Sequence, residues 1–254
     1  MFRRSKKFSL FRALWLLPWR TIRVVWRTLR IGWWAAVTAV LVSIVAVISF
    51  TWLTPPTSGI QLQRQIEAKF DSKTDWNPQH QWVEWQAISP SVALAVIGAE
   101  DQRFLDHNGF DAVQIQKALA ASQQGKTLRG ASTITQQTAK NIFLWNGRSF
   151  VRKGLEAWFS VLMELCWSKQ RILEMYLNSI EFGPGIFGVE AASQHYFGKT
   201  AKDLNRYEAA LLAAVLPNPH RLHVDNPSAY VRKRQVWIVN QMRQLGGEQI
   251  ILAL

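Results

Sequence analysis

Two glutamates and four cations in the middle of the chain have the types and spacing of a group-transfer site. Glu100 closes the apolar segment SVALAVIGA, where burial and the negative end of a helix dipole both disfavour a charged carboxylate. A carboxylate in such a place is suited to accept a proton from a hydroxyl group. On these residues alone, an ordinary polar helix end facing water fits the same pattern, so both interpretations stay open.

The second carboxylate is preceded by two cations. Arg152 and Lys153 stand four and three residues before Glu156, so the three occupy neighbouring positions on one helix. Glu156 falls at the border of the apolar stripe of that helix, which predicts a half-buried acid. Lys140 and Arg148 add two more cations, and four that converge can bind a pyrophosphate. The alternative is a surface ion pair worth about 0.3–0.5 kcal/mol.

Uncharged polar side chains share one face of the predicted helix that follows residue 131. Ile and Ala alternate with them, whereas Lys and Glu are commoner on a helix exposed to solvent. Amides and hydroxyls suit the hydroxyl and N-acetyl groups of a sugar. A buried hydrogen-bonded network is the alternative. The residues concerned are Ser132, Thr133, Gln136, Gln137 and Asn141.

The elements that must position these residues are predicted to be helices, and the fold class is mainly α. Ser89-Pro90 begins an apolar helix that runs through Ile97, Asp111 caps a helix to about Gln124, and Ser149 begins a helix through Trp167. The 61–87 segment has little periodicity and is expected to be irregular, and no strand pattern is evident. Further helices are expected at 169–179, 187–196, 203–216 and 228–245. The helix that begins at Ser149 is expected to turn an apolar stripe toward the core, formed by Leu155, Trp158, Phe159, Leu162, Leu165 and Cys166.

A membrane-spanning helix is predicted over residues 32–53. No charged residue occurs from Ile31 to Gln63, and a helix of this length spans about 33 Å, enough for a hydrocarbon core of about 30 Å. A cleaved signal peptide is the alternative, but its apolar region is shorter, about 7–15 residues. The basic residues that precede the span predict a cytoplasmic N-terminus and an extracytoplasmic bulk.

The net charge of +13 belongs mostly to the N-terminal tail. The 1–30 segment holds nine basic residues and no acid, which leaves 21 basic against 17 acidic residues in the rest. Nucleic-acid binding by the whole chain is therefore not expected. The predicted organisation is a cytoplasmic basic tail at 1–31, a transmembrane helix at 32–53, a linker and membrane-proximal segment at 54–87, and a catalytic domain at 88–254.

Five sequence blocks in a fixed order carry a resemblance to a known family. They are EDQRFLDHNGFD at 100–111, GASTITQQTAKN at 130–141, RKGLE at 152–156, KQRILEMYLN at 169–178, and HYFGK at 195–199 with EAALLAA at 208–214. Over roughly 84–220 the chain resembles the peptidoglycan glycosyltransferases, and most closely the monofunctional biosynthetic peptidoglycan transglycosylases. The family commonly has two glycines where this chain has Gly130 and Ala131.

The resemblance implies a lysozyme-like helical lobe, a small membrane-proximal jaw subdomain and the polymerisation of lipid II with inversion at the anomeric carbon. It implies Glu100 and Glu156 as catalytic residues, with Glu156 orienting the cations beside it. His107 is expected to be a structural hydrogen bonder. The substrate-binding residues that it implies are Asp101, Phe104, Ser132, Gln136, Gln137, Lys140, Asn141, Arg148, Arg152 and Lys153.

Cofactors and partners follow from the same resemblance. No HExxH or CxxC spacing is present, so no metal site is expected, although Mg²⁺ could bridge the substrate pyrophosphate without dedicated ligands. The expected partners are lipid II, a lipid-linked glycan chain, the bilayer and other cell-wall synthesis or division proteins. The expected location is a bacterial inner membrane, with the catalytic domain periplasmic.

Two other functions remain open on the sequence. A lytic, glycan-cleaving enzyme of similar fold would use one acidic glutamate but has no need of the cation cluster, because its substrate lacks a pyrophosphate. A non-catalytic scaffold of a cell-wall complex has no need of Glu100 and Glu156 together.

Overall fold

The structure is a computed structural model that describes residues 7–70, 78–123, 132–147 and 149–254. Its first unit is helix α1 (Lys7–Ser49), whose Thr21–Ser49 part is long and apolar enough to cross a membrane. The helix ends at Ser49, before the expected end at residue 53, because the backbone turns at residues 50–52. The second unit is Phe50–Leu254, and it contains the candidate catalytic residues.

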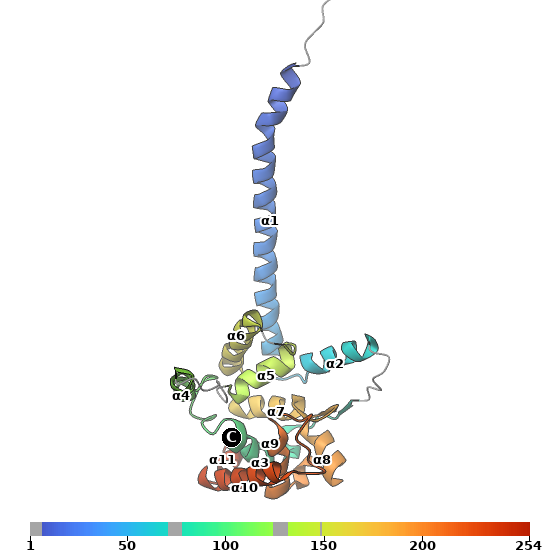
Figure 1. Cartoon of the computed structure of the whole chain (residues 1–254), viewed down its shortest axis with the longest axis vertical. Helices are drawn as coiled ribbons and strands as arrows, with labels where there is room; N and C mark the ends of the chain where they lie inside the picture. The colour runs from blue at the N-terminus through green and yellow to red at the C-terminus, as the bar shows by residue number, and fades with distance from the viewer. Residues whose placement is uncertain (1–6, 71–77, 124–131, 148) are drawn as a thin grey trace, which may run out of the picture. The chain divides into compact units, whose positions relative to one another are not determined.

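The second unit is mainly helical, as predicted, and Figure 1 shows its helices. They are α2 (Gly59–Phe70), α3 (Pro90–Glu100), α4 (Ala112–Gln123), α5 (Ile134–Phe143), α6 (Phe150–Cys166), α7 (Lys169–Ser179), α8 (Val189–Phe197), α9 (Arg206–Val215), α10 (Ala229–Gln244) and α11 (Gln249–Leu252). Short 3-10 helices occupy Trp85–Ala87 and Ala201–Asp203. The four helices expected from α7 onward begin and end within three residues of their predicted limits.

Two helices begin at caps that the sequence identifies correctly. Asp111 accepts hydrogen bonds from the amides of Val113 and Gln114 at the start of α4, at 2.9 and 3.0 Å. The Ser149 hydroxyl accepts from the amide of Arg152 at 3.1 Å at the start of α6. Ser89 has the position of a cap before α3 but makes no capping bond, because its hydroxyl donates to the carbonyl of Leu204 at 2.8 Å.

The membrane-proximal segment is more regular than expected. Residues 61–87 were predicted to be irregular, yet α2 begins at Gly59 and continues to Phe70. A Cβ at Gly59 would collide with the carbonyl oxygen of Leu144, so only glycine allows α2 to approach the end of α5 this closely. The sequence signal is weak because the helix is stabilised by this tertiary contact.

A small sheet also departs from the prediction that no strand is present. Strands β1 (Gln79–His80), β2 (Glu181–Gly183) and β3 (Ile186–Phe187) pair in the order β1-β3-β2. The β1–β3 pair is parallel and the β2–β3 pair antiparallel. Strands of two or three residues are too short to produce an alternating pattern, which explains why the sequence did not reveal them.

The core lies around α3 and α7. Residues Ser91–Gly98 of α3 are buried, and α3 packs against α9 and α10. Residues Ile172–Ser179 of α7 are also buried, and α7 packs against α5. In Figure 1, α7 is drawn between α5 and the group formed by α3, α9 and α10. The end of α3 and the face of α5 therefore both belong to the packed interior, which fixes the site residues that they carry.

Candidate functional site

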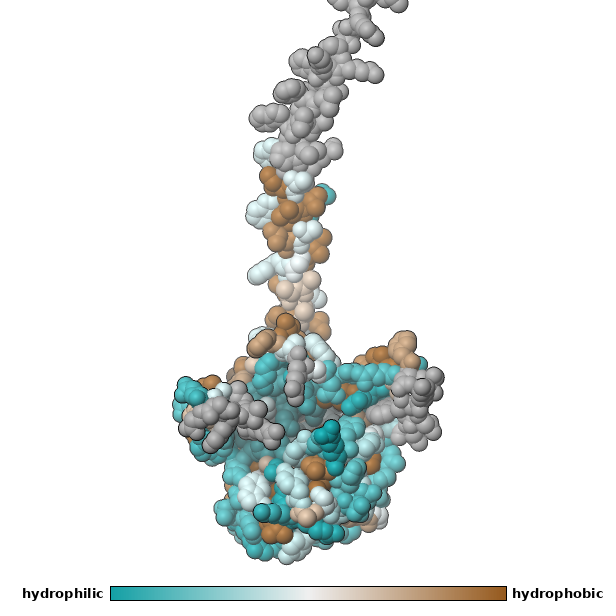
Figure 2. Space-filling view, in the orientation of Figure 1, coloured by the Kyte–Doolittle hydropathy of each residue, from teal (hydrophilic) through white to brown (hydrophobic). Residues whose placement is uncertain are grey.

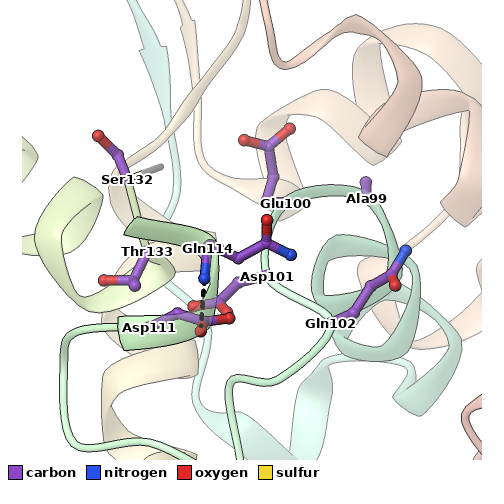
Figure 3. Close-up of a pocket in the computed structure, with 8 residues that line it drawn as sticks. All are labelled: Ala99, Glu100, Asp101, Gln102, Asp111, Gln114, Ser132 and Thr133. Carbon is purple, nitrogen blue, oxygen red and sulfur yellow. Dashed lines mark hydrogen bonds between the residues drawn. The ribbon is translucent and has the colours of Figure 1, made fainter. Parts of the chain in front are cut away.

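Glu100 is the last residue of α3, as predicted, and it lines a hollow of about 160 Å³. Figure 3 shows its carboxylate pointing away from the carboxylates of Asp101 and Asp111. Oε2 accepts a hydrogen bond from the Gln137 amide nitrogen at 3.0 Å. Oε1 accepts no hydrogen bond from any described residue, and the basic nitrogen near it is that of Arg234, at 3.8 Å. One oxygen of Glu100 is thus held and the other is open to a proton.

Gln137 is oriented by a second partner. Its carbonyl oxygen accepts from the Tyr176 hydroxyl at 3.3 Å, which leaves its amide nitrogen to donate to Glu100. Burial raises the pKa of Tyr176 well above its usual value, and the charges of Glu100 and Asp101 add to this. The phenol therefore keeps its proton and remains a donor.

Lys140 lies one turn after Gln137 on α5 and lines a second hollow of about 240 Å³, together with Gln137 and Asn141. Its ammonium donates no hydrogen bond to any residue in the described part of the chain. Burial is the main cause that lowers the pKa of Lys140, and the positive charges of Arg152 and Lys153 lower it further. The negative charges of Glu156 and Glu100 act in the opposite direction and raise that pKa. A largely buried ammonium without a partner is costly, so this position favours an anionic ligand.

Glu156 holds the other two cations of the predicted cluster. Arg152 donates to its Oε2 at 2.8 Å, and the Lys153 ammonium is in short contact with its Oε1. Glu156 is only 4 % exposed, so it is more deeply buried than the half-buried position that the sequence predicted. Arg152 and Lys153 line a third hollow of about 330 Å³, with Ser149 and Phe150.

The predicted residues are therefore distributed over three hollows. Gln137 connects the first two, since it lines the hollow of Lys140 and donates to Glu100 in the other. The negative charges of Glu100 and Glu156 both raise the pKa of Lys140, so the ammonium is within electrostatic reach of both carboxylates. Ser132 is exposed and lines the hollow of Glu100. Arg148 lies outside the described residues.

Several predicted binding residues stabilise the wall of the site through their own hydrogen bonds, and Asp101 also lines the hollow of Glu100. Both oxygens of Asp101 are engaged, by His107 at 2.9 and 3.1 Å and by the Ile134 amide at 3.0 Å. Phe104 is fully buried, so it does not reach the hollow. Thr133 and Gln136 form a reciprocal capping box that begins α5. His107 is a structural hydrogen bonder, as expected.

A buried ion pair that the sequence did not reveal supports this wall. The Lys169 ammonium lies 2.9 Å from both oxygens of Glu164, and it donates to the His107 carbonyl at 2.6 Å. Thr135 of α5 also donates to Glu164, at 2.6 Å. The pair thus joins α5, α6 and α7 to the loop after Glu100. Its one sequence signal is the lysine that begins the KQRILEMYLN block.

The described residues contain no group of three or more His, Cys, Asp or Glu side chains placed to hold a metal ion. The oxygens of Asp101 are occupied by protein donors and those of Glu156 by cations, so neither is a free ligand.

The open carboxylate oxygen of Glu100, the unpartnered ammonium of Lys140 and the ion-paired Arg152 and Lys153 suit group transfer from a substrate with an anionic leaving group. Comparison with protein families agrees with this class. The family model described as "Transglycosylase" matches residues 67–243, which is more than half of the chain. The chain therefore belongs to the transglycosylase family.

Relatives give the same result over most of the sequence. The chain is similar to proteins named "Biosynthetic peptidoglycan transglycosylase" from three bacteria. Identity is 54% over 204 residues with that of Shewanella oneidensis, covering 80% of this chain and 86% of the relative. It is 55% over 208 residues with that of Aeromonas hydrophila, covering 82% and 87%. It is 53% over 211 residues with that of Ectopseudomonas mendocina, covering 83% and 87%.

Proposed function

We propose that this protein is a peptidoglycan glycosyltransferase of cell-wall synthesis that polymerises lipid II into glycan strands. The 4-hydroxyl oxygen of an acceptor lipid II attacks the anomeric carbon of a lipid-linked glycan. A carbon–oxygen bond forms there, the bond from that carbon to the pyrophosphate oxygen breaks, and polyprenyl pyrophosphate leaves. The reaction inverts the anomeric carbon. The observation that carries this proposal is the juxtaposition, through Gln137, of the open oxygen of Glu100 with the unpartnered ammonium of Lys140.

Each group has a distinct part in the proposed reaction. Glu100 takes the proton of the attacking hydroxyl on Oε1, while Gln137 holds Oε2. Lys140 binds the pyrophosphate, whose charge it can neutralise in a site largely shielded from water. Glu156 keeps Arg152 and Lys153 in place as further ligands of the leaving group. Mg²⁺ is compatible with this scheme as a bridge between phosphate oxygens and does not need a protein site.

The substrate and the protein are proposed to meet at the bacterial inner membrane. The apolar Thr21–Ser49 part of α1 is consistent with a single-pass anchor. The positively charged tail favours a cytoplasmic N-terminus, which puts the catalytic domain in the periplasm. We retain 1–31 as the tail, 54–87 as the membrane-proximal segment and 88–254 as the glycosyltransferase domain. Other cell-wall synthesis or division proteins are the proposed protein partners.

Exposed apolar faces on two helices support a membrane-contacting jaw. On α2 they are Leu62, Ile66 and Phe70, at 47, 48 and 88% exposed. On α6 Phe150 and Leu165 are 99 and 78% exposed. The predicted core stripe is therefore wrong for Leu165 and for Trp158, which is 37% exposed. Figure 2 shows hydrophobic surface at the outer end of α2. Such faces suit insertion among lipid headgroups.

The apolar run Phe143–Trp145 at the end of α5 offers less surface. Phe143 stacks on Phe159 with ring centroids 4.4 Å apart and Leu144 is buried, so Trp145, at 45% exposed, is the residue of this run that can reach lipid. We expect replacement of Phe150 and Leu165 by serine to weaken binding of the Phe50–Leu254 segment to anionic liposomes in co-sedimentation. Replacement of Leu119, an exposed apolar residue of α4, is the control. Equal binding by the two variants would refute the α6 contact.

The proposed activity is tested with the purified full chain in detergent and lipid II. Wild-type protein should produce long glycan strands on gels, and Glu100→Gln should not. Asp106→Asn, which changes an exposed carboxylate in the loop after Glu100, is the matched control and should remain active. Strand synthesis by Glu100→Gln would remove Glu100 as the base.

The same proteins separate the other two functions. Release of soluble muropeptides from purified sacculi, without strand synthesis, would identify a lytic enzyme. Neither activity, with both variants indistinguishable from wild type, would indicate a scaffold.

A further inference from the structure

Arg234 lies beside the carboxylate of Glu100 although it belongs to a distant helix, α10. One of its terminal nitrogens is 3.8 Å from Oε1 of Glu100 and donates to the carbonyl oxygen of Ala99 at 3.3 Å. The two side chains are 23 and 16% exposed, so the pair is sheltered from solvent. Among the described residues, Arg234 is the one cation that forms an ion pair with Glu100 within 4 Å.

The position of Arg234 is rigidly defined. Helix α10 packs against α3 and α9. The approach to α3 is so close that a Cβ at Gly98 would lie 3.3 Å from the Cβ of Gln241. The guanidinium carbon of Arg234 lies 5.6 Å from the ring centre of Trp237, one turn further along α10, in a cation–π contact. The guanidinium is therefore held on the side of Glu100 without depending on substrate.

The end of α3 needs such a cation. The last carbonyls of a helix lack intrahelical partners and carry the negative end of its dipole, which disfavours a carboxylate at the same end. Other charged or titratable groups near Glu100 are Asp101 beside it, Lys140 on α5, and Tyr176 on α7, which stays neutral. Arg234 satisfies the Ala99 carbonyl and brings a positive charge to the carboxylate from the α10 side.

We propose that Arg234 is a positioning residue that draws Oε1 of Glu100 toward the acceptor hydroxyl from the α10 side. The distance of 3.8 Å is too long for a hydrogen bond, so Arg234 attracts Oε1 without occupying the lone pair that receives the proton. Gln137 holds the other oxygen by a direct bond. The inference rests on the proposed function, in which Glu100 is the general base.

The test compares kcat and KM of glycan polymerisation for Arg234→Gln, Arg234→Lys and the control Lys233→Gln. Lys233 is the exposed neighbour on α10, and its change removes the same charge. Arg234→Gln should lower kcat about tenfold and leave KM nearly unchanged. Arg234→Lys should recover part of kcat, because the charge remains but its geometry changes.

The outcomes distinguish this role from a structural one and from failure of the proposed function. A raised KM with unchanged kcat in Arg234→Gln, no recovery of kcat in Arg234→Lys, or an equal loss of kcat in Lys233→Gln would overturn the positioning role. If Arg234→Gln does not fold, as judged by its melting curve, Arg234→Lys and Trp237→Leu carry the test. Both should then lower kcat at constant KM, and wild-type kcat in both overturns the proposal. Polymerisation by wild type leaves the proposed function standing in each case, whereas its absence overturns that function itself.

Discussion

Replacing Lys140 by methionine should change activity and stability in opposite directions. The ammonium is largely buried, it donates no hydrogen bond to a described residue, and the cations Arg152 and Lys153 add to the burial that lowers its pKa. Methionine has similar length and no charge to desolvate. The free enzyme should therefore gain stability on substitution, while the substrate loses a cation at its pyrophosphate.

Both magnitudes can be estimated. A hydrogen bond to a charged group is worth about 1.5–3 kcal/mol, which corresponds to a loss of roughly 10- to 150-fold in kcat/KM. The relief of desolvation is about 1–2 kcal/mol, below the cost of a fully buried ion, because Lys140 keeps some exposure to water and the charge of Glu156 favours its ammonium. For a domain of about 200 residues this raises Tm by about 2–8 °C.

The assay pairs lipid II polymerisation with thermal unfolding followed by tryptophan fluorescence in the same detergent. Lys117→Met, at an exposed lysine of α4, is the control and should change neither quantity. A decrease in Tm for Lys140→Met would mean that Lys140 is a structural ion-pair partner. Unchanged kcat/KM would mean that it does not bind the leaving group. Either result would refute the reasoning.

Three further predictions follow from the same geometry. Glu156→Gln removes a buried carboxylate that holds two cations. It should destabilise the domain by about 2–3 kcal/mol, seen as a Tm lower by about 5–10 °C. A decrease in Tm no larger than that of the exposed Glu67→Gln would contradict the pairing. Since the pKa of Lys140 is lowered, its charge is lost as pH rises through that lowered pKa, so kcat/KM should fall on the alkaline side. Lys140→Arg should move this alkaline limb to higher pH, and coincident profiles would exclude Lys140 as its origin. Arg171 donates to the carbonyls of Phe50 and Leu53 at 2.7 to 3.1 Å and to Glu174 at 3.0 Å. Arg171→Met should therefore lower Tm by several degrees and raise protease cleavage near residue 53. Cleavage like that of wild type would show that these bonds do not hold the segment.

Local signals in the sequence were sufficient for most of the helices. Asp111 and Ser149 make their caps with amides two or three residues away, so the short range of the interaction makes the helix start predictable. Glu100 was correctly assigned to the end of α3 for the same reason. The α6 stripe shows the limit of periodicity, because it identified an apolar face but not that Trp158 and Leu165 on it are exposed.

The remaining features depend on contacts between distant parts of the chain. β1 pairs with β3 across more than a hundred residues, and α2 requires the end of α5 against Gly59. Arg234 has no motif beside it that points to Glu100, and only the packing of α10 on α3 brings the two together. The same packing separates the unpartnered ammonium of Lys140 from Asp101, Gln136 and Gln137, whose polar atoms are used within the protein.

The account depends on one substrate lying between Glu100 and Lys140. The most direct measurement is a structure of the full chain with an unreactive lipid-pyrophosphate donor analogue and an acceptor glycan. We expect the acceptor 4-hydroxyl within hydrogen-bond distance of Oε1 of Glu100, and the pyrophosphate in contact with the ammonium of Lys140, on the two sides of Gln137. A pyrophosphate bound away from Lys140, or an acceptor hydroxyl out of reach of Glu100, would contradict the account.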